Sequence, residues 1–215
     1  MKAEIKRKGG PKDELINQII ETEWKMFDLV RNEGGRAACQ DDAWTFYVMR
    51  YSQHHVFSEA ALSSYRQDLT LARQEGRNLI TEKYAYMMEF TEPDYFDRNL
   101  KDQLPRISPE KQRLVDSAAN LMIRFEREFE ERYPAFADRG RPLTGIGSGD
   151  VSFHIYAIGE LKTYSDRTLE LYLADLRNAV SNKENPSIAI HEMTAQFYGY
   201  KSLDYAEAKL KDRHF

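Results

Sequence analysis

Apolar residues recur at spacings of three and four along most of this sequence, and this periodicity is the feature that most constrains its fold. Ile16, Ile20, Glu23, Phe27 and Val30 follow it in the first such stretch, which predicts an amphipathic helix with one carboxylate on its apolar face. Only the alternation near 151–156 suggests a strand, and it has no obvious partner strand. We therefore predict an all-α protein.

The same reading predicts a single-domain multi-helix bundle of about eight to nine helices. Serine, asparagine and aspartate caps, together with glycine and proline stops, set the expected ends. The helices are expected near 11–32, 42–55, 58–75, 78–90, 108–133, 152–163, 166–181, 187–198 and 203–212, with a short one near 96–100. The caps of the last four include Ser165, Ser187 and Ser202.

Two segments fall outside this pattern. Residues 1–12 carry five lysines and arginines against one acid and end in Gly-Gly-Pro, so we expect a flexible basic N-terminal tail. Residues 134–150 hold two prolines and four of the eleven glycines, which predicts a Gly/Pro-rich loop. The remaining span, 13–212, is expected to form one helical domain.

Composition excludes several classes of protein. With 31 lysines and arginines against 35 acids, the net charge of −4 argues against nucleic-acid binding. The uninterrupted apolar runs are far shorter than the ~20 residues that span a bilayer, so we expect no membrane insertion. A single cysteine and no secretory leader indicate a cytoplasmic protein.

Several catalytic motifs are incomplete. His191-Glu192 begins like a zinc-protease helix, but Ala195 stands where the second histidine belongs. Residues 145–149 resemble a phosphate-binding loop without its lysine, so a flexible connector is the main interpretation and an anion-binding nest or lid the alternative. A metal-dependent enzyme with Glu and His ligands is therefore only the second alternative for the function. No metal ligand is assigned, and the cofactors stay unknown.

Carboxylates at core-compatible positions are the first candidates for chemistry. Glu23 lies in the apolar stripe of the first helix, where a carboxylate needs a partner or a proton. Glu82 and Glu89 share one face of the fourth helix, which is either solvated or buried. We assign Glu23 and Glu89 as catalytic acid–base candidates and Glu82 to substrate binding, with an internal salt bridge as the structural alternative for Glu23.

The stretch 33–42 is the second candidate, because it combines a glycine turn with Arg36, Cys39, Gln40 and Asp41. Three interpretations stay open. Cys39 is a nucleophile ahead of a helix, Arg36 holds an anionic group with Gln40 and Asp41 beside it, or the segment is a structural loop.

Tyrosines and histidines complete the set. Tyr86, Glu160 and Tyr164 are assigned to substrate binding, since buried tyrosines facing a carboxylate form a polar network in which a small ligand can bind. His54, His55, His154 and His191 are candidate acid–base groups that the sequence does not rank. His191 lies on an apolar helix, so the favoured alternative for it is a hydrogen-bonded core histidine.

Four strings, at 33–42, 76–89, 159–165 and 198–203, resemble a bacterial family that is catalogued as a domain of unknown function. Their letters are EGGRAACQDD, GRNLITEKYAYMME, GELKTYS and YGYKSL. The resemblance spans about residues 13–210 and implies a single bacterial cytoplasmic domain. It implies no activity.

Together these features predict a small-molecule-binding helical protein with a carboxylate, tyrosine and arginine pocket for acid–base chemistry on a small anionic metabolite. In that hypothesis Glu23, Arg36, Asp41, Glu82, Glu89 and Glu160 surround one pocket. Whether the protein is an enzyme stays open, and a non-enzymatic helical interaction or regulatory module is the first alternative. A homodimer is compatible with either.

Overall fold

The computed structural model describes residues 9–31, 35–145 and 151–212, and within these ranges every regular element is a helix. The N-terminal helices are α1 (Pro11–Asp28), α2 (Ala43–His55), α3 (Glu59–Gln74), α4 (Leu79–Thr91) and α5 (Pro93–Tyr95). They are followed by α6 (Pro109–Arg132), α7 (Pro134–Ala137), α8 (Phe153–Thr163), α9 (Asp166–Asn182), α10 (Pro186–Phe197) and α11 (Leu203–Lys211). Two 3₁₀ segments, η2 (Ala38–Asp41) and η4 (Lys101–Gln103), and a π-helical turn, η3 (Phe96–Leu100), complete the described fold.

The all-α prediction is confirmed, but the predicted count of eight to nine helices is wrong, because the described residues form eleven α-helices. The additional ones include α5 and α7, single turns of three and four residues that each begin at a proline. A segment this short has too few residues to show an apolar period. The alternation at 151–156 is not a strand, since Ser152 caps α8 there.

Side-chain caps account for most helix starts. Asp42, Ser58, Asn78, Ser108, Ser165 and Ser202 each accept a hydrogen bond from a backbone N–H of the first turn. Two boundaries differ from the sequence prediction. The cap of α10 is Asn185 with Pro186 after it, and not Ser187, and α1 ends at Asp28 instead of near Asn32.

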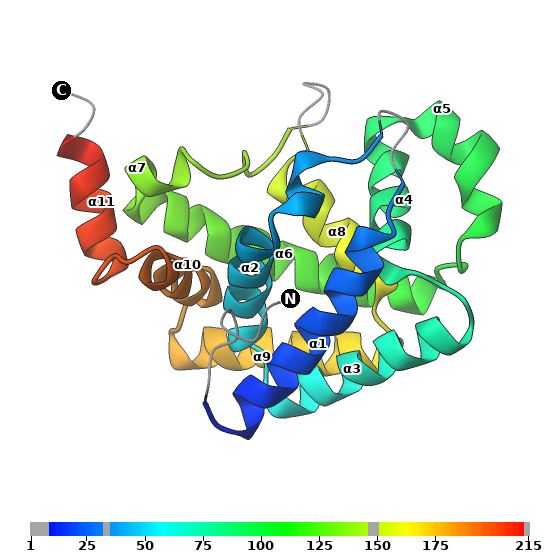
Figure 1. Ribbon diagram of the computed structural model, residues 1–215, viewed down its shortest axis with the longest axis horizontal. Coiled ribbons are helices and arrows are strands. Elements are labelled where there is room, and N and C mark those ends of the chain that lie inside the picture. The colour runs from blue at the N-terminus through cyan, green and yellow to red at the C-terminus, as the bar shows by residue number, and fades with distance from the viewer. Residues whose placement is uncertain (1–8, 32–34, 146–150, 213–215) are drawn as a thin grey trace.

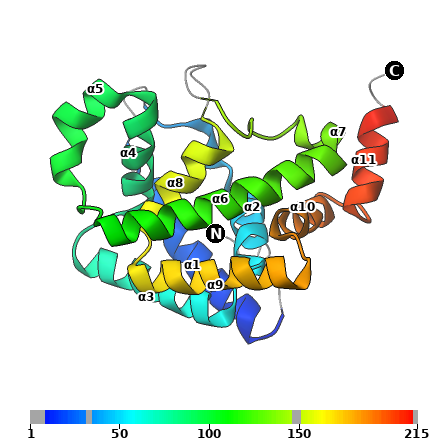
Figure 2. The same cartoon turned by 180° about the vertical axis from the view of Figure 1, so that it is seen from behind.

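The longest helix, α6, runs through the middle of the molecule between α11 at one end and α5 at the other (Figure 1). Seen from behind, α9 lies alongside α6 (Figure 2). Helix α8 packs against both α4 and α6, while α1 packs against α2, α3 and α4. The helices before and after the 134–150 segment therefore pack directly on one another.

One large hydrophobic core joins the helices on both sides of α6. Ile20 of α1, Tyr51 of α2, Phe125 of α6 and Leu169 of α9 are almost completely buried within it. A smaller cluster at one end packs α11 against α6 and α10 through Phe129, Ala195, Leu203 and Ala206, together with Tyr133.

The predicted tail and loop are only partly described. Helix α1 begins at Pro11, so Lys12 of the predicted tail is helical, and its Nζ donates to the backbone carbonyl of His55 at 2.7 Å. Residues 1–8 lie outside the described ranges, as do residues 146–150 of the glycine-rich loop. Among the described helices, none combines the length and apolar character that a membrane span needs.

Candidate functional site

Arg50 is the centre of a buried polar network between α1, α2 and α8. Its Nε donates to Glu23 Oε2 at 2.8 Å, and Nη2 donates to Glu23 Oε1. Its Nη1 donates to Glu160 Oε1 at 2.9 Å and to Gln53 Oε1 at 2.7 Å. Residues 23, 50 and 160 are each at most 5% exposed, so one guanidinium neutralises carboxylates from two distant parts of the chain.

A second layer of donors satisfies the same carboxylates. Tyr65 donates to Glu23 Oε1 at 2.8 Å, and Tyr164 donates to Glu160 Oε1 at 2.9 Å. Lys83 Nζ donates to Glu160 Oε2 at 2.6 Å and lies 3.4 Å from the centroid of the Tyr156 ring. Two carboxylates thus face one guanidinium and one ammonium, which is the balance that a buried ionic cluster needs.

Gly159 explains how Glu160 reaches Lys83. A Cβ at position 159 would lie 2.8 Å from the backbone oxygen of Lys83 and 2.5 Å from Met87 Cγ, so only glycine allows this close approach of α8 to α4. The neighbouring Glu160 is thereby placed within reach of the Lys83 ammonium.

The network fixes the protonation of its members. Burial alone would raise the pKa of Glu23, but the charge of Arg50 and the contact with His54 outweigh burial and lower that pKa to about 2. Burial also opposes ionisation of Glu160, yet Arg50 and Lys83 hold its pKa well below the usual range. Burial and the adjacent carboxylates raise the pKa of Tyr65 and of Tyr164 well above 10, so both phenols stay neutral donors.

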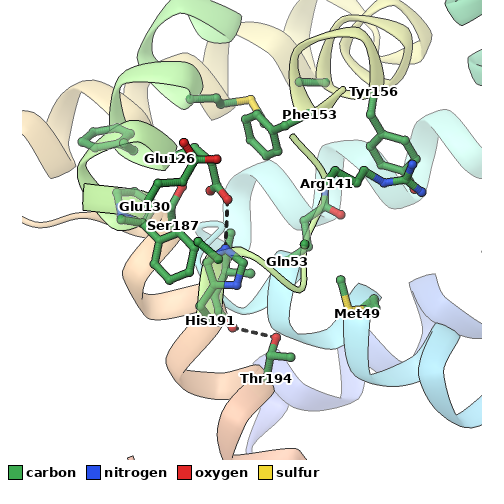
Figure 3. Close-up of a pocket in the computed structure, with 18 of the residues that line it drawn as sticks. Met49, Gln53, Glu126, Glu130, Arg141, Phe153, Tyr156, Ser187, His191 and Thr194 are labelled. Carbon is green, nitrogen blue, oxygen red and sulfur yellow. Dashed lines mark hydrogen bonds and ion pairs between the residues drawn. The ribbon is translucent and has the colours of Figure 1, made fainter. Parts of the chain in front are cut away.

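A cavity of about 850 Å³ opens beside this network, between α2, α6, α8 and α10 (Figure 3). Arg50, Gln53, Glu160 and Tyr164 contribute to its lining. The remaining walls are largely apolar and aromatic: Met49, Met122, Phe125, Phe129, Phe136, Phe153, Tyr156, Leu161, Tyr172 and Ile190.

Further polar groups reach the cavity from α6, α10 and the segment after α7. Figure 3 shows Glu126, Glu130 and Ser187 near His191, and Arg141 beside Tyr156. His191 Nε2 lies 3.1 Å from Glu126 Oε1. Burial and the charge of Glu126 raise the pKa of Glu130. The cavity therefore combines apolar walls with a few convergent polar side chains, as small-molecule sites do.

Of the six charged residues expected around one pocket, the structure joins Glu23 and Glu160 through Arg50, and only Glu160 lines the cavity. Glu82 instead accepts two hydrogen bonds of 2.8 Å from Arg77, and Glu89 is exposed and paired with Lys162. The spacing of Glu82 and Glu89 does place them along one face of α4. Each carboxylate nevertheless pairs with its own nearby cation, so the two do not share a pocket.

The structure also gives hydrogen-bond partners to Tyr86, Tyr164 and His191. Tyr86 donates to the backbone oxygen of Pro105 at 2.7 Å, which fastens α4 to the following loop. Tyr164 belongs to the buried network through Glu160. His191 is hydrogen-bonded as expected, although it lies at the cavity and not in the core.

The 33–42 segment has the geometry of a structural loop in its described part, 35–42. Arg36 is exposed and binds Asp28 at 2.7 Å and Asp41 at 2.8 Å, so its guanidinium does not reach the cavity. Gln40 is buried, and its amide donates to the carbonyls of Phe27 and Val30 at the end of α1. Cys39 is an exposed free thiol.

Sequence reasoning missed Arg50 and Lys83, although the signal that identified Glu23 applies to both, and it named His54 only as one of several unranked histidines. Arg50 stands between Tyr47, Tyr51 and His54 on the buried face of α2, and Lys83 follows Leu79 and Ile80 on that of α4. A buried cation in an apolar stripe needs an anion beside it, just as a buried carboxylate needs a cation. Glu126 and Glu130 carry no comparable signal, since they sit in the charge-rich string of α6.

No group of three or more metal-ligating side chains forms within the ranges 9–31, 35–145 and 151–212. The alternative of a Glu/His metal enzyme is therefore not supported by any ligand set in these ranges.

Comparison with known proteins identifies the family and nothing finer. The chain belongs to DUF4125, a family described as a protein of unknown function, whose model matches residues 13–208. No curated protein and no solved structure matches the chain.

Proposed function

We propose that this DUF4125 member binds a small organic molecule with an anionic group in the cavity between α2, α6, α8 and α10. The cavity is the observation that carries the proposal. Its volume of about 850 Å³ suits a metabolite-sized ligand, and its walls offer aromatic surface with a few polar groups. An interaction module would instead be recognised by a flat exposed apolar face.

The anionic group follows from which cation is available. All three nitrogens of Arg50 already donate to Glu23, Glu160 or Gln53, so this buried guanidinium is occupied by its own network. Arg50 is therefore a structural part of the cavity wall.

Arg141 has the opposite character. It lines the cavity from an exposed position, with its guanidinium carbon 4.9 Å from the centroid of the Tyr156 ring. Its Nη1 donates a long hydrogen bond of 3.4 Å to the backbone oxygen of Val151. Among the described carboxylates, none lies within ion-pair distance of it. The planar fork of arginine binds carboxylate or phosphate with two parallel hydrogen bonds, so Arg141 is the side chain we assign to the anionic group of the ligand.

A thermal-shift screen against small carboxylates and phosphates tests the proposal. A ligand present at a hundred times its Kd should raise the melting temperature of the protein by about 5–10 °C, because it binds only the folded state. The Arg141→Gln variant should melt like the wild type without ligand and lose most of that rise.

Arg106→Gln, at an exposed position that does not line the cavity, is the matched control and should keep the full rise. If no carboxylate or phosphate raises the melting temperature, or if Arg141→Gln responds like Arg106→Gln, the proposed anion site is wrong.

A further inference from the structure

His191 and Glu126 form a fixed imidazole–carboxylate pair at the cavity. Besides the 3.1 Å contact, the imidazole stacks on Phe129, with ring centroids 3.8 Å apart and planes 15° from parallel. Phe136 packs against the imidazole edge-on, with centroids 5.9 Å apart. The imidazole and carboxylate side chains are 22% and 12% exposed, respectively, so the plane of the ring and its partner are set before any ligand arrives.

The pairing assigns the two ring nitrogens. An ionised carboxylate only accepts hydrogen bonds, so the tautomer that matches an ionised Glu126 carries its proton on Nε2 and leaves the lone pair on Nδ1. Within the described part of the chain, no group hydrogen-bonds His191 Nδ1. That atom is also not sealed from solvent, in contrast to Nδ1 of His54, which is buried without a partner. A basic nitrogen is thus open to a molecule in the cavity.

Ser187 supplies a hydroxyl on the same wall. It lies four residues before His191 on α10, which places both side chains on one face of that helix. The residue is only 6% exposed and lines the cavity, yet its hydroxyl has no hydrogen-bond partner among the residues that the structure describes. That hydroxyl is not among the side-chain atoms that are sealed from solvent without a partner, so it can donate to a ligand oxygen in the cavity.

We infer that His191 is a general base that removes a proton from a carbon next to the carbonyl group of a small organic acid bound in this cavity. The inference rests on the proposed function, with Arg141 holding the acid group. The proton passes from the carbon to Nδ1, and the electron pair of the broken C–H bond moves into the enolate, whose oxygen accepts from Ser187.

Glu126 stabilises the imidazolium that forms, and return of the proton to carbon restores both partners, so the step needs no redox partner. A carbonyl neighbour is required because, without an electron sink, a carbon acid is too weak for an imidazole to deprotonate.

Proton exchange with heavy water tests this without knowledge of the natural substrate. The full chain is incubated in D₂O with 2-oxobutyrate, 2-oxoglutarate and 3-oxo acids, and loss of the C–H signal next to each carbonyl is followed by proton NMR. We expect exchange above the spontaneous rate for at least one acid that binds. His191→Gln should lower that rate by about 10²–10⁴-fold while the acid still raises the melting temperature.

Ser187→Ala and Glu126→Gln should slow exchange less than His191→Gln does. His154→Gln, which removes a histidine that does not line the cavity, should leave the rate unchanged. Binding of these acids without exchange above that of His191→Gln overturns the inference but leaves the proposed function intact. If none of these acids binds, the inference is wrong, whereas the proposed function is overturned only if no carboxylate or phosphate in the thermal-shift screen binds either.

Discussion

At the scale of single residues, Arg50 connects carboxylates that are far apart in the sequence, since Glu160 lies 110 positions after it. Removing the guanidinium leaves Glu23 and Glu160 buried with too little positive charge. We expect Arg50→Met to lower the free energy of unfolding by about 3–5 kcal/mol, measured by urea denaturation at neutral pH. The exposed pair of Arg113 and Glu110 gives the control, because Arg113→Met should cost less than about 1 kcal/mol. Similar losses in both variants would contradict a stabilising role for the network.

The same residues show what sequence reasoning can identify. A carboxylate inside an apolar stripe predicts burial with a partner, and Glu23 has both. The identity of the partner is not readable, because it depends on which distant helix packs there. A partner that is close in sequence is easier to predict. Arg36 and Asp41 are only five residues apart, and they pair with each other on the surface.

At the scale of elements, the contact of α8 with α4 depends on Gly159. Alanine is a better helix former than glycine by about 1 kcal/mol, so propensity alone predicts that Gly159→Ala stabilises the protein. The new Cβ would instead meet the Lys83 carbonyl oxygen at 2.8 Å, which forces α8 away from α4. We expect a net loss of about 1–3 kcal/mol in the free energy of unfolding, measured by urea denaturation.

Ala189→Gly, at an exposed position within α10, measures the intrinsic preference of a helix for alanine and should cost about 1 kcal/mol. A Gly159→Ala protein as stable as the wild type would show that the two helices separate without cost.

The long helices were predictable because periodicity and capping act within a few residues of each other. Ser108-Pro109 and Ser165 mark starts that the structure keeps. The end of α1 was placed too late because Val30 continues the apolar stripe, whereas Gln40 binds the carbonyls of Phe27 and Val30 from outside the helix. A helix end fixed by a distant side chain leaves no local signal.

At the scale of the whole molecule, the cavity is the feature that the sequence could not predict. The cavity exists because the side chains of α2, α6, α8 and α10 do not fill the space between these helices. No local sequence pattern predicts such a space. The assigned site residues accordingly include two that line the cavity, Glu160 and Tyr164, and His191 was one of several unranked histidines. Arg141, Ser187 and Glu126 become candidates only once the helices are placed.

Acid stability is also a property of the whole molecule, because the buried network joins the N-terminal helices to α8. The folded pKa of Glu23 is about 2, against an ordinary value of 4.5, and that of Glu160 is lowered as well. Between these values the unfolded chain binds protons that the folded chain does not. The stability that both carboxylates contribute is therefore complete above about pH 4.5 and is lost as the pH falls toward 2.

We therefore expect the urea midpoint to fall steeply below about pH 4.5. Glu160→Gln should be less stable than the wild type at neutral pH, because Lys83 then lacks its counter-charge and Arg50 keeps only Glu23. Its midpoint should also depend less on pH in the acid range, because one carboxyl with a lowered pKa is gone. Glu110→Gln, which removes an exposed carboxylate, should keep the wild-type slope. Parallel acid profiles for all three proteins would mean that the stability of the fold does not depend on the ionised network, whatever its geometry.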